Sequence, residues 1–333
     1  MGMRSGRRQE KWQRERNRDK KSKKLKRSRN KKNIRYSGWR EIPSGNAPEE
    51  ITQGCLVLEG GAFRGLYSQG VLDALMENGI NMYCTIGVSA GALAGFNYVA
   101  GQIGRSARAN LRFRHYKDYV GSAALRHAHS PIRLDFLFND YNKLEPLNEK
   151  RFLDPARRYI AVATNCLTGK TEYFERGVCR DIFSAMKASA SMPFISPMVT
   201  VDGTPCLDGG CSCKIPYRWA LDQNFDKIVI VRTRETAYRK HIHKRSRMLR
   251  FYRKYPEFAQ ALARSDRDYN RQCDEIEQLE DDGRVFVLKP SSKVMVGRIE
   301  GDMEKLGSLY WQGYRDTMNR IGELREYLQG TVS

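Results

Sequence analysis

The sequence predicts an α/β protein with a three-layer α/β/α fold, in which helices cover both faces of a mostly parallel central sheet. Short apolar runs typical of strands buried on both faces recur at 56–58, 159–164 and 227–232. Segments with apolar residues at helical spacing lie between these runs. Strand, helix and strand also follow one another closely in residues 55–91, which is the pattern of a βαβ unit.

The βαβ unit is the first part of this fold. An apolar run at 56–58 predicts a strand that stops at Gly60 and Gly61. A helix is predicted over 66–76 and a second strand over 83–86. A right-handed crossover makes the two strands parallel, so we expect the loops that follow them to meet at the same, C-terminal edge of the sheet.

The second of these loops has the form G-x-S-x-G. It consists of Gly87, Val88, Ser89, Ala90 and Gly91. In this pattern a serine occupies a sharp strand-to-helix turn, and the crowded backbone favours glycine on both sides. The serine hydroxyl then projects from the edge of the sheet, which makes Ser89 a candidate nucleophile.

The first loop is rich in glycine and can present free main-chain N–H groups beside that serine. Such groups stabilise an oxyanion. The loop residues are Gly60, Gly61, Ala62, Phe63, Arg64 and Gly65. Each motif is a weak signal alone, but their joint placement is a strong one.

These residues resemble the patatin-like phospholipases, and the closing helical stretch resembles the bacterial branch. That family has a G-G-G-x-R/K-G oxyanion loop, a G-x-S-x-G turn one βαβ unit later, and a distant D-G-A/G. The last motif is matched by Asp208, Gly209 and Gly210, and the likeness covers about 55–224. The resemblance implies a patatin-like fold and a serine esterase that cleaves phospholipid acyl esters. It also implies a dyad of Ser89 and Asp208 that needs no metal or cofactor.

The oxyanion loop departs from the family pattern at Ala62, which stands at the third glycine position. We expect its methyl group to be tolerated if φ stays negative. Arg64 has two interpretations: it can hold the loop by bonding to backbone or a carboxylate, or it can meet a phosphate head group. The position of Arg64 within the motif favours the first.

Asp208 follows a predicted hairpin whose turn is Asp202-Gly203. As the general base for Ser89, it should be partly desolvated, because burial raises the pKa of a carboxylate. The order Ser89, Asp208, then His241 or His243 also fits an α/β-hydrolase triad. Both histidines lie in a strongly basic stretch, which favours a solvated loop and therefore the dyad.

Charge divides the chain. The formal net charge is +21, and residues 1–40 hold 18 Lys and Arg against 3 Asp and Glu. We expect a disordered basic arm at 1–36, a catalytic domain at 50–235, and a helical extension at 236–333 packed on that domain. The arm can be a solvated tail, or can bind an anionic membrane or nucleic acid phosphates.

The start of the chain lacks an apolar h-region, and no apolar run is long enough to cross a membrane. We therefore expect a cytoplasmic protein, with peripheral membrane attachment as an option for the arm. The eight cysteines lack the spacing of a disulfide framework, so we expect them to be reduced. Cys206, Cys211 and Cys213 cluster near Asp208, but without a C-x-x-C pair or a neighbouring histidine no metal site is predicted.

The remaining segments are less informative. Residues 105–150 mix aromatic, basic and apolar residues, and can form an acyl pocket, a mobile cover, or helices packed on the sheet. Later helices are expected at 246–255, from 256 through 262, at 269–279 and at 302–328, with a strand at 285–288. Two functions from other classes stay open: an RNA- or membrane-binding protein with a vestigial hydrolase site, and a non-catalytic scaffold.

Overall fold

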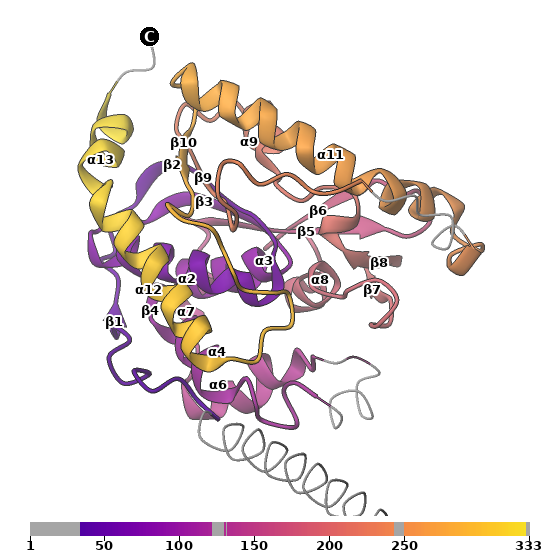
Figure 1. The fold of residues 1–333 in the computed structure, drawn as a ribbon, viewed down its shortest axis with the longest axis horizontal. Helices are drawn as coiled ribbons and strands as arrows, with labels where there is room; N and C mark the ends of the chain where they lie inside the picture. The colour runs from indigo at the N-terminus through magenta and orange to yellow at the C-terminus, as the bar shows by residue number, and fades with distance from the viewer. Residues whose placement is uncertain (1–33, 122–129, 131, 243–249, 331–333) are drawn as a thin grey trace, which may run out of the picture.

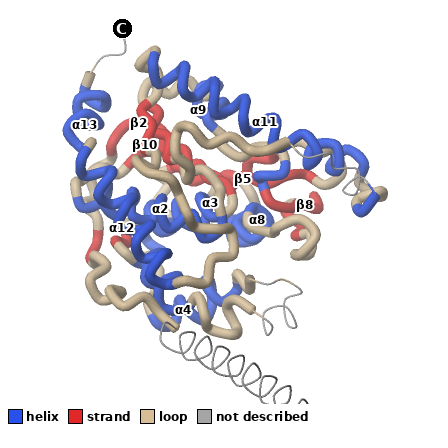
Figure 2. Tube along the Cα trace, viewed as in Figure 1, coloured by secondary structure: helices blue, strands red, loops and turns tan. Residues whose placement is uncertain are grey.

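The computed structural model describes residues 34–121, 130, 132–242 and 250–330. It has three layers, with an eight-stranded sheet between two layers of helices (Figure 1). Figure 2 shows the strands in the middle, with α11 on one side and α2, α3 and α12 on the other. The predicted α/β/α fold is thereby confirmed.

The sheet has the strand order β10-β9-β2-β3-β5-β8-β7, and β6 also pairs with β5. The five strands from β10 to β5 are parallel, whereas β6 and β8 run antiparallel to β5. The strands are β2 (Thr52–Leu58), β3 (Met82–Val88), β5 (Arg158–Asn165), β6 (Thr171–Glu175), β7 (Val199–Val201), β8 (Thr204–Asp208), β9 (Ile228–Val231) and β10 (Phe286–Leu288). A separate pair joins β1 (Gly45–Asn46) to β4 (Gln102–Ile103).

The central strands are apolar throughout because both of their faces are covered. In β2, Leu56 and Leu58 face one hydrophobic core, whereas Cys55 and Val57 face a second one on the opposite side. All four side chains are fully buried. This two-sided burial explains why the sequence reads as continuous apolar runs instead of alternating ones.

The helices divide between these two cores. The first core is covered by α2 (Gly65–Glu77), α3 (Ala90–Val99), α4 (Arg105–Phe113), α8 (Ile182–Ser189) and α12 (Met303–Asn319). The second is covered by α9 (Tyr217–Asp222) and α11 (Pro256–Asp281). Shorter elements are η1 (Ala62–Arg64), η2 (Phe136–Asp140), α6 (Tyr141–Leu144), α7 (Glu149–Phe152), η3 (Gly209–Cys211) and α13 (Ile321–Gln329). Within the described ranges, no helix is both long and apolar enough to cross a membrane.

Three predicted helices differ from the structure. The segments expected from 256 and at 269–279 form the single helix α11. Its apolar stripe is interrupted because Ser265 and Asp266, both polar, occupy inward-facing positions. The helix expected at 302–328 is divided at Arg320, whose guanidinium binds Val287 O at 2.7 Å. Of the helix expected at 246–255, residues 246–249 lie outside the described residues, and the described part is helical only at 250–251 and then turns.

The arm expected at 1–36 also lies almost wholly outside the described residues. Its last residue, Tyr36, belongs to the packed structure. The N–H of Tyr36 donates to Leu111 O at 2.9 Å, and the ring occupies the space that a side chain at Gly307 would need. The folded part therefore includes Tyr36.

Helices α2 and α12 touch backbone to backbone. A Cβ atom at Gly70 would clash with the carbonyl of Tyr310, and one at Gly313 would clash with the carbonyl of Tyr67. The Tyr67 hydroxyl also donates to Asp316 at 3.2 Å. Helix α12 thus packs directly on α2, the helix that follows the glycine-rich loop.

Candidate active site

The G-x-S-x-G turn joins β3 to α3 at the C-terminal edge of the sheet. Ser89 has φ 56° and ψ −120°, a strained conformation for a residue with a side chain. A Cβ atom at Gly87 would lie 2.6 Å from Ala92 N, and one at Gly91 would lie 2.6 Å from Leu58 O. The backbone is therefore crowded on both sides of the serine, and glycine is required at both flanks.

Asp208 reaches this edge from the opposite direction, at the end of β8. Because β8 is antiparallel to β5, Asp208 pairs with Ala163, next to the residue that pairs with Val88. The hydroxyl of Ser89 donates a 2.7 Å hydrogen bond to Oδ2 of Asp208. A side chain at Gly209 would clash with Val162 O, so glycine allows this close approach.

The surroundings of Asp208 tune its basicity. Burial raises the pKa of the Asp208 carboxyl above the usual range. The hydrogen bonds from Ser89 and from Gly210 N, which donates to Oδ1 at 2.8 Å, oppose this rise, as do the charges of Arg298 and Lys214. The carboxylate is thus desolvated, while hydrogen bonds and nearby cations still stabilise its charged form. This combination suits a group that exchanges a proton with a hydroxyl.

The glycine-rich loop lies beside this pair. Among the described residues, the amides that donate hydrogen bonds are Gly60 N to Lys214 O, Phe63 N to Arg298 O, Arg64 N to Gly61 O, and Gly65 N to Ala62 O and Phe63 O. The amides of Gly61 and Ala62 have no such partner in the same part of the chain and are the available donors. Both residues line the hollow that contains Ser89 and Asp208.

Ala62 does not meet the condition of a negative φ under which its methyl group would be tolerated without strain. Its φ is 50°, in the left-handed region. The third position of the loop therefore demands a glycine-like conformation, and alanine adopts it at some cost in strain. The loop is fastened beside this point by Glu59, whose Oε2 accepts the N–H of Thr233 at 2.5 Å.

Ser189, at the end of α8, is a part of the site that sequence reasoning missed. Its hydroxyl accepts the N–H of Ser89 at 2.8 Å and donates to Val162 O at 2.5 Å. Ser189 therefore ties the strained turn to strand β5. Its distance of 100 residues from Ser89 leaves no local sequence signal.

Two cavities meet at Ser89. One runs between α2, α3 and the segment 132–141 and has a mainly apolar lining. The other lies on the Asp208 side. The second is lined by five basic residues and three acidic ones. These are Arg64, Lys214, Arg234, Lys240 and Arg298, with Glu59, Asp208 and Asp266.

Burial and mutual repulsion shape the basic cavity. Burial, together with the charges of Lys214 and Arg298, lowers the pKa of Lys240 to about 6, although Lys240 lies 3.4 Å from Asp266. Arg64 is 7% exposed, and burial lowers its pKa to about 10, with Arg234 contributing. In the described part of the chain, its guanidinium makes no hydrogen bond or ion pair. Arg64 thus does not hold the loop through its side chain, contrary to the favoured interpretation.

The two described histidines, His115 and His241, lie away from this pair. His241 is exposed to solvent, and His243 falls outside the described residues. No described histidine lines either cavity. The group that accepts the hydrogen bond of the Ser89 hydroxyl is the carboxylate of Asp208.

Comparison with known proteins gives two family matches. The model of the patatin-like phospholipase family matches residues 56–221, and that of a domain of unknown function, DUF6363, matches 255–329. The uncharacterized protein YjjU of Escherichia coli is 27% identical over 183 residues, which is 54% of this chain and 51% of YjjU. The uncharacterized NTE family protein Rv1063c of Mycobacterium tuberculosis is 27% identical over 189 residues, or 53% and 48% of the two chains.

A solved structure, VipD from Legionella pneumophila, matches with a TM-score of 0.49 and 15% identity, over 84% of this chain and 68% of VipD. The chain spans about half the length of the curated relatives it matches. The family match from β2 to α9 includes both Ser89 and Asp208. The chain belongs to the patatin-like phospholipase family.

Proposed function

We propose that this protein is a serine acyl hydrolase that cleaves the carboxylic ester of an anionic glycerophospholipid. The observation that carries the proposal is the 2.7 Å hydrogen bond from Ser89 Oγ to Asp208 Oδ2, at the junction of an apolar and a basic cavity. A serine hydroxyl needs an adjacent base to become a nucleophile, and the hydrogen bond to Asp208 supports that residue as the base.

The reaction takes two steps. Asp208 accepts the proton of Ser89 as Oγ attacks the ester carbonyl, and the amides of Gly61 and Ala62 stabilise the resulting oxyanion. The C–O bond to the leaving alcohol then breaks, and Asp208 returns the proton to that oxygen. In the second step water attacks the carbonyl carbon of the acyl-enzyme and gives a proton to Asp208. The bond to Ser89 Oγ then breaks, Asp208 returns the proton to Oγ, and the free acid leaves.

The two cavities suggest the orientation of the substrate. The apolar cavity suits the acyl part, since ligand pockets for apolar groups have apolar walls. The basic cavity suits the leaving alcohol and its phosphate, because Arg64 is a buried cation without a bonded partner in the described residues. Pairing with a phosphate would compensate that charge.

Labelling by a fluorophosphonate probe, together with hydrolysis of a lipid panel, tests the proposal. Wild type should be labelled and should release fatty acid, whereas Ser89→Ala should do neither. Ser308→Ala removes an exposed serine of α12 and serves as the matched control. Equal fatty acid release by wild type and Ser89→Ala would overturn the proposal.

The basic arm is a separate question. We propose that it holds the enzyme on an anionic membrane, where each basic residue contributes about 1 kcal/mol. The deletion should remove 1–33 only, because Tyr36 is packed against the body. Retention on anionic vesicles should fall in the deletion variant, whereas loss of RNA retention alone would point to nucleic acid instead.

A further inference from the structure

Apolar side chains surround the mouth of the basic cavity and remain exposed. Phe194, Ile195 and Ile299 line this cavity, and they are 40%, 39% and 56% exposed. Phe251 is 63% exposed, and its ring centroid lies 5.1 Å from that of Phe194. These four residues, called the apolar rim, come from three distant segments of the chain. Exposed apolar groups that gather at one place mark an interaction surface.

The backbone of the rim is strained at Phe194. Its φ is 72°, in the left-handed region, which is unfavourable for a bulky aromatic residue. The N–H of Phe194 donates to the Tyr252 hydroxyl at 2.7 Å, and the centroids of the two rings lie 5.2 Å apart. Such strain persists where the surrounding structure enforces it, and it is concentrated at functional sites. The exposed position of Phe194 is therefore maintained by its surroundings.

Tyr252 connects the rim to the strand that carries Asp208. It is buried and packs in one apolar cluster with Leu207 and Cys211, which lie on either side of Asp208 in the chain. Phe258, near the start of α11, belongs to the same cluster, and its ring centroid lies 4.8 Å from that of Tyr252. The rim therefore has a fixed position relative to the mouth of the cavity.

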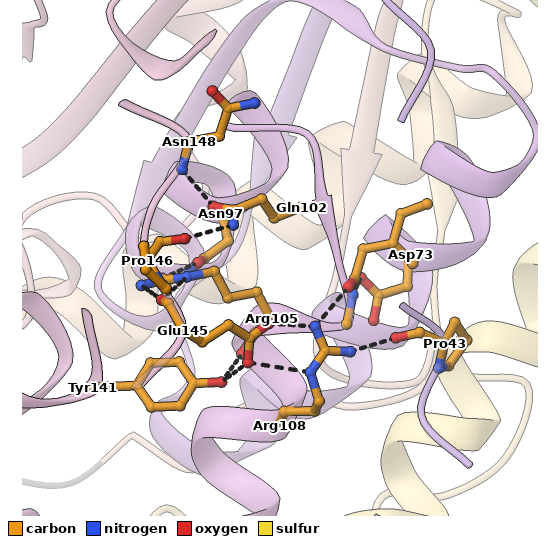
Figure 3. Close-up of polar contacts among 12 residues, drawn as sticks. Pro43, Asp73, Asn97, Gln102, Arg105, Arg108, Tyr141, Glu145, Pro146 and Asn148 are labelled. Atoms are coloured by element: carbon orange, nitrogen blue, oxygen red, sulfur yellow. Dashed lines mark hydrogen bonds and ion pairs between the residues drawn. The ribbon is translucent and has the colours of Figure 1, made fainter. Parts of the chain in front are cut away.

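Cations flank one part of the rim. Three exposed basic residues lie next to Phe251 in the chain, namely Arg250, Arg253 and Lys254. The segment 250–256 has no acidic residue, and within the described ranges these three side chains form no hydrogen bond or ion pair. Arg108, by contrast, is bound by the carboxylate of Glu145 (Figure 3). Apolar groups beside free cations have the chemistry that binds the interface of an anionic membrane.

We propose that the apolar rim and these cations form the surface by which the protein docks on an anionic lipid bilayer. The rim enters the head-group layer and the cations pair with lipid phosphates, so the mouth of the basic cavity opens onto the lipid. The choice of a bilayer as the occupant rests on the proposed function, since a lipid ester must pass from the membrane to Ser89. The arm at 1–33 adds attraction to negative charge, whereas the rim determines which face of the protein meets the membrane.

Fluorescence tests the docking without chemistry. Phe251→Trp is made in the full chain together with Ser89→Ala and is mixed with vesicles of equal parts phosphatidylcholine and phosphatidylglycerol. The signal of the four native tryptophans is subtracted by use of Ser89→Ala alone. The emission of the added indole should shift to shorter wavelength, and it should be quenched when the lipid acyl chains carry bromine.

Val178→Trp in the same background is the matched control. Val178 is 80% exposed and follows β6, whose last residue, Glu175, pairs with Ile160 near the start of β5. It therefore lies toward the opposite edge of the sheet from Ser89, and the emission of an indole there should not change. Equal quenching of the two added indoles, or no quenching in Phe251→Trp, would overturn the inference.

A charged substitution gives a second test. Phe251→Glu should weaken retention on the same vesicles by about tenfold, because a carboxylate is repelled by anionic lipid and does not enter the head-group layer. Val178→Glu should be retained as wild type is. Equal retention of the two variants would contradict the inference. So would a dimer that Phe251→Glu dissociates, without quenching in Phe251→Trp, because a second copy of the chain would then cover the rim.

Hydrolysis of vesicle lipid separates this inference from the proposed function. Quenching in Phe251→Trp without fatty acid release by the protein that retains Ser89 would sink the proposed function alone. Fatty acid release without that quenching would sink this inference alone.

Discussion

The hydroxyl of Ser189 accepts a hydrogen bond from the main-chain N–H of Ser89 and donates one to Val162 O. Substituting Ser189 by alanine would leave both main-chain groups buried without a partner. We expect a loss of about 1–3 kcal/mol in unfolding free energy and a lower kcat, because the strained turn relaxes. Denaturant unfolding and steady-state kinetics measure the two effects.

Ser191→Ala is the control for Ser189→Ala. Its hydroxyl binds Lys187 O at 2.8 Å and does not touch the turn. A kcat that falls equally in both variants would mean that Ser189 acts only through the stability of the end of α8.

The pH profile should report Asp208. Burial raises the pKa of Asp208, and the base must be unprotonated, so kcat/KM should fall on the acid side with an apparent pKa above that of an ordinary aspartate. Asp208→Asn should lower kcat by about 10²–10⁴-fold, as expected for loss of a general base. Retention of the acid limb in the residual activity of Asp208→Asn would assign that limb to another group.

The dyad and the triad differ in their need for histidine. We expect the double variant His241→Ala/His243→Ala to hydrolyse ester at a rate near that of wild type, because Asp208 itself contacts the serine. Fluorophosphonate labelling and ester hydrolysis check this. A loss of several orders of magnitude would instead favour a triad.

The contact between α2 and α12 should tolerate no methyl group. Gly313→Ala would place its Cβ against Tyr67 O, and such overpacking costs about 1–3 kcal/mol. Gly322→Ala is the matched control in α13, because the space around Gly322 is open. It should be neutral or stabilising by at most about 1 kcal/mol. Equal stability of the two variants in thermal unfolding would contradict a tight contact.

Asp73 should make stability depend on pH. Burial raises its pKa to about 7, against the hydrogen bonds from Gly104 and Tyr310. From about pH 4 to 7 the folded state then holds a proton that the unfolded chain has lost, so stability falls as pH rises, by up to about 1.4 kcal/mol per pH unit. Asp73→Asn mimics the protonated form and should lack this slope. Parallel curves of unfolding free energy against pH for the two proteins would refute the assignment.

The local parts of the site could be predicted from the sequence. Gly87 and Gly91 are required by backbone crowding within a few residues of Ser89, so the motif carries its own geometry. The Asp-Gly turn at Asp202 likewise forms the hairpin that places Asp208, with φ 49° at Asp202 and 82° at Gly203. The conformation of such strands and turns depends on residues that are close in the chain, so it can be predicted from the sequence.

Other parts depend on contacts between distant segments and were not predictable. The positive φ of Ala62 arises in a loop braced by Glu59 and Thr233, which are 174 residues apart. The interior of α11 was misread because Asp266, a buried aspartate, serves Lys240 from an inward-facing position. The spacing of apolar residues along a helix does not show that a buried polar residue has a charged partner elsewhere in the chain.

The contact between α12 and α2 joins two segments of the chain that separate family models match, so the two segments pack as one body. Replacing 255–329 by an unrelated sequence would remove the backbone of α12 that packs against Gly70. Gly70 lies on α2, the helix that follows the glycine-rich loop. The contact therefore links residues that the two family models match separately, even though neither Gly70 nor Gly313 lines the cavities at Ser89.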